Sequence, residues 1–221
     1  YTFAMDELSN YLGMKDIKKI EAYDVSHISG ENGVASSIVF TKTGPEKRSY
    51  RLFNIPNHLS GNDVGSLEHV LERRIKYFND PKIKPDLLLI DGGLGQLSSV
   101  HDVLDELAVS DLQVVAISKG PDRHAGREQF HIRGRPSFTL PPDSAAMHFL
   151  QRLRDEAHRY AIGTHRNKRA KAEFTNPLDA MPGIGPKRKK ALLAHFGSAR
   201  AVAAAGLTDL QAVDGISKKF A

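Results

Sequence analysis

Apolar and β-branched residues are concentrated in three segments of the first quarter of the chain, separated by polar turn residues, and this pattern predicts β-strands. We expect strands at residues 17–28, 34–43 and 48–55, joined by turns at 30–33 and 43–45, after a helix at Thr2–Leu12. Such short connections favour an antiparallel meander.

The spacing of apolar residues changes further along the chain. Residues 63–78 and 94–107 have near-helical spacing, whereas 86–90 and 113–118 are continuous apolar runs typical of buried parallel strands. A small hairpin is expected from 129–132 and 137–140. A long helix is then expected after Pro141-Pro142, with Asp143 as its N-cap and an end near Arg169. Its predicted apolar stripe consists of Ala146, Phe149, Leu150, Leu153, Ala157, Tyr160 and Ala161.

The order of these elements indicates an α/β fold with a mixed sheet and flanking helices. Three antiparallel strands, a helix, a strand, a helix, a strand, a hairpin and a long helix make up the order of a ribonuclease H-like fold. Residues 178–221, after a short linker at 174–177, are alanine-rich and contain glycine hairpins at 182–185 and 214–217. We therefore expect a ribonuclease H-like domain at 1–173 and a small all-α tandem helix-hairpin-helix domain at 174–221, its second unit truncated.

Composition adds a charge asymmetry to this picture. The net charge of the 221-residue chain is +5. Between residues 159 and 200 the acidic residues are Glu173 and Asp179 alone, against the basic residues Arg159, Arg166, Lys168, Arg169, Lys171, Lys187, Arg188, Lys189, Lys190 and Arg200. A solvated helix face would explain this, but a polyanion such as nucleic acid is the favoured interpretation.

Several classes of protein are excluded or disfavoured. The chain has no cysteine, which excludes disulfides and thiolate chemistry and is compatible with a reducing cytoplasm. It has no apolar run of membrane-spanning length and no signal peptide at its start. Because its ends fall inside expected helices, we expect it to be a fragment of a longer protein.

Two aspartates lie where a carboxylate is costly to leave without a partner. Asp24 lies within the first apolar strand and Asp91 directly follows the run at 86–90. Adjacent strands that bring them together would make an oxygen site for a hard divalent cation, Mg²⁺ or Mn²⁺, with carboxyl groups within roughly 4–6 Å of each other. Ser26 shares the strand face of Asp24, whereas His27 lies on the other face and is expected to be a hydrogen-bonded structural histidine.

Two similar patterns fail a closer test. The segment ending at Asp91 is similar to the metal-binding strand of a nucleoside triphosphatase, but the chain has no Gly-x-x-x-x-Gly-Lys-Ser/Thr loop. Gly93-Leu94-Gly95 is similar to a dinucleotide fingerprint, but Ser98 occupies the third glycine position. No nucleotide cofactor is expected.

Four motifs together resemble one bacterial family over nearly the whole chain. They are Asp24-Val25-Ser26-His27, Ile90-Asp91-Gly92-Gly93 with Gly95-Gln96, Lys119-Gly120 with Arg123, and Arg154-Asp155-Glu156-Ala157-His158-Arg159. They resemble the C-terminal half of UvrC, the dual-incision nuclease subunit of bacterial nucleotide excision repair. The resemblance implies a metal-dependent endonuclease that cuts 5′ to a lesion in double-stranded DNA. It also implies a cytoplasmic, nucleoid-associated protein of the DNA-damage (SOS) response.

The same resemblance implies partners and further site residues. UvrB, in the UvrA-dependent pathway, is expected to bind segments outside this chain. His158 matches a histidine of the family's final helix and would bind metal, contact metal-bound water or act as acid or base, with a surface histidine as the alternative. Asp63 is either a helix N-cap or catalytic support, and Asp155 is a candidate to orient His158.

Phosphate contacts are expected in two places. Around the metal site the candidates are Lys119, Arg123, Arg152, Arg154 and Arg159. In the hairpins they are Gly183, Gly185, Lys187, Arg188, Lys189, Gly215 and Lys218, where backbone N–H groups at a helix start meet a phosphate without reading sequence.

One alternative function stays open at this stage: a non-catalytic module that binds structured DNA on a ribonuclease H-like fold. The presence of Asp24, Asp91 and His158 together favours the nuclease. The sequence leaves open whether one or two ions act, the lesion range, the host, the incision position, the oligomeric state and how the site is kept inactive. It also leaves open whether the second hairpin binds DNA.

Overall fold

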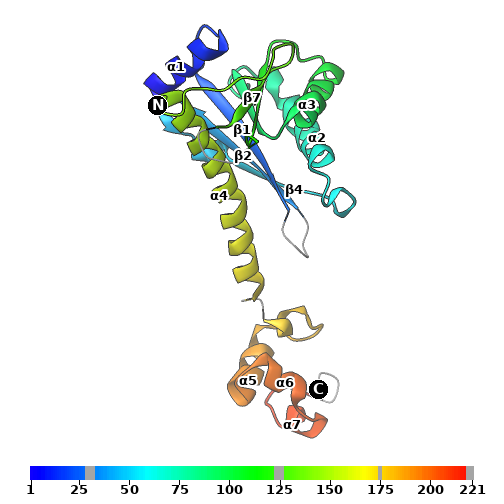
Figure 1. The fold of residues 1–221 in the computed structure, drawn as a ribbon. Helices are drawn as coiled ribbons and strands as arrows, with labels where there is room; N and C mark the ends of the chain where they lie inside the picture. The colour runs from blue at the N-terminus through cyan, green and yellow to red at the C-terminus, as the bar shows by residue number, and fades with distance from the viewer. Residues whose placement is uncertain (28–32, 122–126, 174–175, 218–221) are drawn as a thin grey trace. The chain divides into compact units, whose positions relative to one another are not determined.

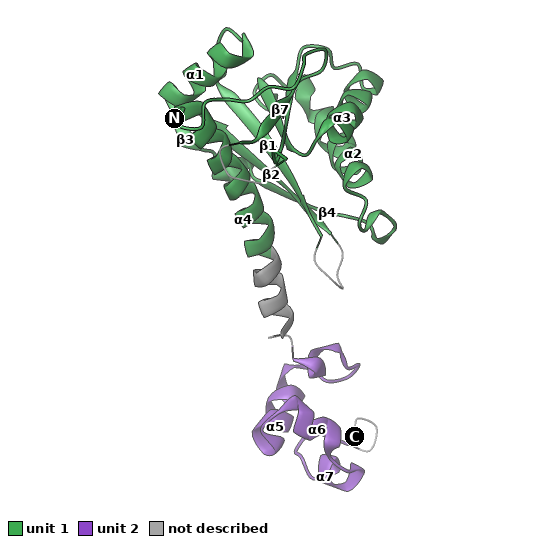
Figure 2. Cartoon of the chain, in the orientation of Figure 1, with its two compact units in different colours: residues 1–164 green, residues 165–221 purple. Residues whose placement is uncertain are grey.

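The computed structural model describes residues 1–27, 33–121, 127–173 and 176–217, with the side chains of 165–173 left out. Contacts divide the chain into two compact units, Tyr1–Thr164 and His165–Ala221 (Figure 2). The predicted boundary between 173 and 174 lies at the end of helix α4 (Ala145–Glu173), whereas the contacts divide the chain inside that helix. Within the described ranges, no helix is long and apolar enough to cross a membrane.

A mixed sheet forms the centre of the first unit. Its strands are β1 (Lys19–Ser26), β2 (Val34–Thr41), β3 (Gly44–Pro45), β4 (Arg51–Asn54), β5 (Leu87–Asp91), β6 (Gln113–Ser118) and β7 (Gln129–His131). The strand order is β3-β2-β1-β5-β6-β7, and β4 also pairs with β2. β1, β5 and β6 are parallel, whereas β2, β4 and β7 run antiparallel to their neighbours. The predicted meander and the two buried parallel strands are therefore confirmed.

Helices cover both faces of this sheet (Figure 1). Helices α1 (Thr2–Leu12) and α4 pack on one face, and α2 (Asp63–Ile75) and α3 (Leu94–Glu106) pack on the other. Successive side chains of β1 and β5 point to opposite faces of the sheet. Ile20, Ala22, Leu87 and Leu89 belong to the core on the α4 side, and the residues between them face α2 and α3. Asp24 and Asp91 continue the α4-facing series.

The irregular connections differ from the sequence prediction. The expected turn at 43–45 contains β3, and the expected third strand begins as a 3-10 turn, η1 (Lys47–Ser49), before β4. The predicted hairpin is reduced to β7 and a single bridge between Phe130 and Phe138. Short 3-10 turns also precede and follow α2, at η2 (Asn57–Leu59) and η3 (Lys76–Asn79).

The predicted cap of α4 is wrong by one residue, and so is the capping role that was one of the two alternatives for Asp63. The N3 backbone N–H of α4 donates to Ser144 Oγ at 3.1 Å, so the cap is Ser144 and not Asp143. Asn62, not Asp63, caps α2, because its side-chain oxygen accepts from Gly65 N at 2.9 Å. Adjacent residues with capping side chains are indistinguishable by pattern alone.

The second unit is a small helical domain with its own apolar core. It contains η4 (Pro177–Ala180), α5 (Pro186–Phe196), α6 (Ala199–Ala204) and α7 (Leu207–Gln211). Leu178, Leu192, Val202, Val213 and Ile216 form the core. Both predicted hairpins turn on a glycine with positive φ, 84° at Gly183 and 82° at Gly215, a conformation that favours glycine.

Candidate active site at the ends of β1 and β5

The register of two parallel strands places Asp24 beside Asp91. Tyr23 pairs with Ile90, so the next residue on each strand is an aspartate, and neighbouring strands lie about 4.8 Å apart. Partial burial raises the pKa of Asp91 above its usual value; Arg154 opposes the rise, and the charge of Asp24 adds to it. The two carboxylates therefore repel each other and favour a shared cation.

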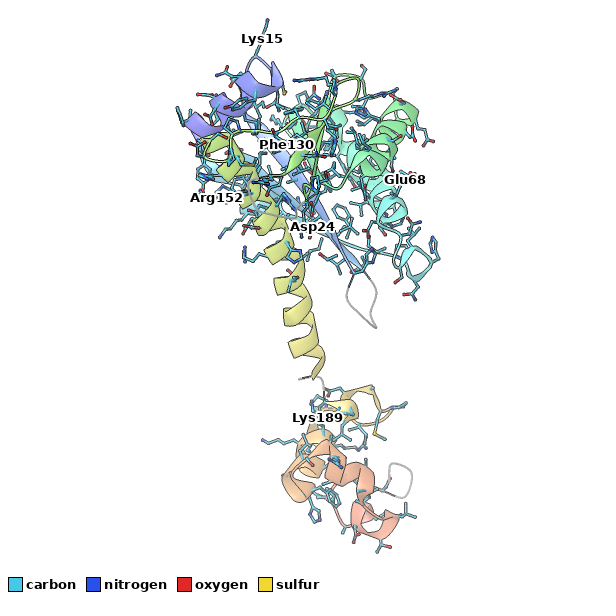
Figure 3. All side chains as sticks on the ribbon, viewed as in Figure 1. Lys15, Asp24, Glu68, Phe130, Arg152 and Lys189 are labelled. Carbon is cyan, nitrogen blue, oxygen red and sulfur yellow. The ribbon has the colours of Figure 1, made fainter. Side chains whose placement is uncertain are left out.

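Asp24 is held by two neighbours through one oxygen. Only 7 % of the residue is exposed. Its Oδ2 accepts from Ser26 Oγ at 2.9 Å and lies 3.1 Å from His158 Nδ1. Figure 3 shows Asp24 on β1 beside α4, the helix that supplies His158. No hydrogen bond to its second oxygen, Oδ1, occurs among the described residues, so this oxygen can take another ligand.

Asp91 is paired with a cation from α4. Arg154 Nη2 lies 3.3 Å from Asp91 Oδ1, and Arg154 Nη1 lies 3.6 Å from Glu128 Oε1. Residues 154 and 158 are one helical turn apart, so α4 presents an arginine to Asp91 and a histidine to Asp24 on the same side. Arg154, predicted as a phosphate contact, thus neutralises a carboxylate of the site.

Glu128 belongs to this cluster and was not predicted. The residue is 6 % exposed, and it accepts from Gln151 Nε2 at 3.2 Å besides contacting Arg154. A carboxylate directly before the short strand β7 was the available signal in the sequence. The role of Glu128 depends on the packing of α4 against that strand, and a local sequence pattern does not predict this packing.

The glycines after Asp91 allow a close approach of backbone and side chain. A β-carbon on Gly92 would lie 2.7 Å from Gln96 Cγ. Gln96 Oε1 instead accepts from Gly93 N at 3.0 Å, which fixes the start of α3 directly after the aspartate.

Asp63 and His27 form a separate contact. His27 Nε2 lies 2.8 Å from Asp63 Oδ1 without completing a hydrogen bond, and Gly61 N donates weakly to His27 Nδ1 at 3.5 Å. Asp63 is the first residue of α2, and its carboxylate contacts His27. In the described part of the chain it makes no direct contact with Asp24, Asp91 or His158. No direct contact joins Asp155 to His158 either among the described side chains.

The predicted DNA contacts have varied surroundings. Lys119 is exposed, and its charge lowers the pKa of Asp91, so it lies near the site. Arg159 forms a two-point ion pair with Glu156 at 2.6 and 2.7 Å, and Arg152 lies over the ring of Tyr1. Arg123 and Lys218 lie outside the described residues.

In the second unit, one predicted phosphate ligand joins the two hairpins. Arg188 donates to Gly183 O at 2.7 Å and to Gly215 O at 3.0 Å. Lys189 forms an ion pair with Asp179 at 2.7 Å, and Lys187 is exposed. Gly185 is the N-cap residue of α5, so the first hairpin leads directly into a helix N-terminus.

The donor set suits a hard cation but is small. Among the described residues, no group of three or more His, Asp and Glu side chains lies close enough to hold a metal ion. Asp24 and Asp91 are the pair whose mutual repulsion such an ion would relieve.

Comparison with known families decides the relationship. Residues 9–162 match the family described as the UvrC RNAse H endonuclease domain. This chain belongs to the UvrC family. Residues 175–221 match a SAM-like helix-hairpin-helix tandem. The ribonuclease H-like fold with a C-terminal helix-hairpin-helix domain, predicted from the order of elements, is confirmed.

Curated relatives agree with this assignment. The chain is 52 % identical over 212 residues to UvrABC system protein C of Cereibacter sphaeroides, covering 92 % of this chain and 34 % of the relative. The protein of the same name from Zymomonas mobilis is 53 % identical over 211 residues, covering 92 % and 32 %. The chain thus spans about a third of the length of these relatives. A human ENDOV structure aligns with 67 % of this chain and 86 % of its own at 14 % identity and a TM-score of 0.40.

Proposed function

We propose that this chain is the metal-dependent nuclease part of a UvrC protein and makes the incision 5′ to a lesion in nucleotide excision repair. One observation carries the proposal: the parallel pairing of β1 and β5 sets Asp24 beside Asp91 on the sheet face that α4 covers. Membership of the UvrC endonuclease family supports it.

The residues divide the chemistry between them. Asp24 and Asp91 would hold Mg²⁺ or Mn²⁺, which supplies positive charge at the scissile phosphate when bound. Nδ1 of His158 faces Asp24, so Nε2 remains to exchange a proton with water or a leaving oxygen. The His158 side chain is 61 % exposed, which keeps it accessible to substrate.

Arg154 has a second role in this proposal. The Arg154 guanidinium lies near two carboxylates, those of Asp91 and Glu128. A divalent ion at Asp91 would replace Arg154 as the counter-charge there, and Glu128 would keep the guanidinium near the site as a partner for phosphate. Lys119 would add a second cation at the same edge.

The second unit supplies a grip on the DNA backbone in this proposal. Gly183, Gly185 and the start of α5 offer N–H groups, and Lys187 adds an exposed charge. Arg188 stabilises both turns through their carbonyl oxygens. The substrate would be damaged double-stranded DNA in the bacterial cytoplasm and nucleoid. UvrB would bind segments of the longer protein outside this chain.

The two incisions of the complete protein provide the test. With UvrA and UvrB on a lesion-containing duplex, Asp24→Asn and Asp91→Asn should each abolish the 5′ cut and leave the 3′ cut at its normal rate. Asp102→Asn, a matched change at an exposed residue of α3, should affect neither.

Equal loss of both cuts would point to misfolding or to an ordering role for the aspartates. A normal 5′ cut with either variant would leave the chain as a non-catalytic module for structured DNA.

A further inference from the structure

A basic groove lies between the edge strand β4 and the C-terminal end of α2. Two hollows, of about 180 and 610 Å³, share the lining residues Arg51, Arg74 and Ile83, so they form one continuous feature. We call it the β4–α2 groove. Seven lysine and arginine residues line the two hollows together, against the single acidic residue Glu46.

Much of this charge is not neutralised within the protein. Arg74 is occupied by the buried Glu21, and Arg48 forms an ion pair with Glu46. In the described part of the chain, Arg51 donates to main-chain oxygens alone, those of Arg48 and Tyr50, at 2.8 Å each. Such bonds fix the guanidinium but leave its charge uncompensated.

Lys19 is half-buried and donates to the main-chain oxygen of Lys82, whereas the other three cations are exposed. Arg73, Lys76 and Lys82 have no acidic partner among the side chains that the structure describes, and all three are open to solvent. This excess of positive charge indicates an anionic ligand.

An aromatic ring lies among these cations. Tyr77 is 51 % exposed, and Lys76 Nζ lies 5.2 Å from the centroid of its ring. Phe53 lines the same hollow. Sites for single-stranded nucleic acid typically combine cations that contact the phosphate backbone with an aromatic ring on which a base stacks.

The groove is separate from the aspartate site. Arg51 pairs with Ser37, which pairs with Tyr23, so these three residues share the sheet face that α2 covers. Asp24 and its partner Ser36 point to the opposite face, where Ser36 Oγ donates to the main chain of α4. A strand lying in the groove is therefore not at the cleavage position.

We propose that the β4–α2 groove binds a segment of single-stranded DNA that is distinct from the strand being cut. Arg51, Arg73, Lys76 and Lys82 would contact phosphates, and a base would stack on Tyr77. Bases of an intact duplex are paired and stacked and do not reach such a ring, which favours an unpaired strand over duplex DNA. An acidic protein segment would use the charges but would not require the aromatic ring.

Binding to a short fluorescent oligothymidylate, followed by anisotropy in chelator, tests the groove in the whole chain independently of cleavage. Arg73→Glu and Lys76→Glu should each weaken binding by about fivefold or more and reduce the log–log salt slope by about 0.7. Tyr77→Ala should weaken it at least about fivefold and leave the slope unchanged. Lys15→Glu, the same reversal at an exposed residue on the loop after α1 (Figure 3), should have less than about a twofold effect.

Photocrosslinking locates the contact. An oligonucleotide with 5-iodouracil should crosslink to the tryptic peptide 77–82, and Asp24→Asn should crosslink equally well, so a failed nuclease proposal leaves this result intact. Equal losses for Lys15→Glu and Lys76→Glu, or crosslinks confined to residues 176–217, would overturn the assignment. A different pair of results would also overturn it. In that case an acidic peptide would bind the groove with the same charge dependence, and the affinity for oligothymidylate would be unchanged in all three groove variants.

Discussion

At the scale of single residues, α4 presents two different side chains to two aspartates one helical turn apart. His158 meets Asp24 and Arg154 meets Asp91. The first contact leaves an imidazole nitrogen available for proton transfer, and the second places a permanent cation on the other carboxylate. The two positions should therefore respond differently to substitution.

His158→Ala should lower the rate of 5′ cleavage by roughly 100-fold, the scale of a lost acid–base group, with DNA affinity nearly unchanged. Single-turnover kinetics are the appropriate measurement, because slow conformational steps can mask a change in the chemical step. His148→Ala, at an exposed position of the same helix, is the matched control. A normal single-turnover rate for His158→Ala would remove the histidine from the chemistry.

Arg154→Gln should tighten Mn²⁺ binding to the chain by about tenfold, since it removes a cation that competes for Asp91 at 3.3 Å. Glu128→Gln should have the opposite sign, because it removes the carboxylate that also attracts Arg154 and leaves the guanidinium more fully on Asp91. Isothermal titration of Mn²⁺ measures both. Equal affinities for the two variants would show that Arg154 does not compete with the metal.

At the scale of elements, a buried polar network joins β1 and β2 to α2. Arg74 contacts both oxygens of Glu21 at 2.7 and 3.1 Å, and Glu21 Oε1 also accepts from Tyr23 and Ser37. Burial raises the pKa of Tyr23 well above its usual value, and the charge of Glu21 raises it further, so the phenol stays a neutral donor.

Breaking this network on one side should be costly. Arg74→Met should reduce the free energy of unfolding by about 3–5 kcal/mol, because it leaves the fully buried Glu21 carboxylate without its cation. Adding Glu21→Leu to Arg74→Met should recover much of that loss, since it removes the unpaired charge. Urea unfolding of the two variants tests this. A double variant no more stable than Arg74→Met would contradict it.

A buried histidine should make the sheet edge sensitive to acid. His131 joins Ser118 on β6 to Ser137, with contacts of 2.8 and 2.6 Å, and burial lowers its pKa below the usual value. A lowered folded-state pKa gives stability that is present above about pH 6.5 and lost as the pH falls through the folded value.

His131→Asn should therefore lose less stability than the unchanged protein between about pH 7 and pH 5, measured by thermal unfolding across that range. His148→Asn should keep the full pH dependence. Identical pH profiles for His131→Asn and the unchanged protein would show that this ring does not contribute.

Some elements were predictable from the sequence because their pattern is local. The strand predicted at 113–118 coincides with β6, and the run at 86–90 gave β5 to within one residue. The two-residue strand β3 has too few positions for any periodicity. The contacts of Arg154 with Asp91 and Glu128 join three separate elements, so they depend on packing that no spacing in the sequence encodes.

At the scale of the whole molecule, the described chain contains the proposed aspartate site and two proposed DNA-binding surfaces. The aspartate site faces α4, the β4–α2 groove lies on the α2 side of the sheet, and the hairpins belong to the second unit. Phosphate contacts in several places predict binding that depends strongly on salt and little on base sequence.

Gly183→Asp should test the hairpin contribution to that binding. A side chain is strained at a φ of 84°, and a carboxylate repels phosphate, so duplex affinity should fall about tenfold or more at low salt. Gly13→Asp, at another left-handed glycine with φ of 67° in the first unit, controls for backbone strain. Equal effects of the two changes on duplex affinity would mean that the hairpin is not a phosphate site.

The central claim is that Asp24 and Asp91 together form a metal-dependent cleavage site. Its most direct test is the single-turnover rate of 5′ incision on a lesion duplex already nicked on the 3′ side, measured against Mn²⁺ concentration. The unchanged protein should reach a saturating rate, and Asp24→Asn and Asp91→Asn should stay at background at every concentration. A normal saturating rate in either variant, or full cleavage by the unchanged protein in chelator, would contradict the account.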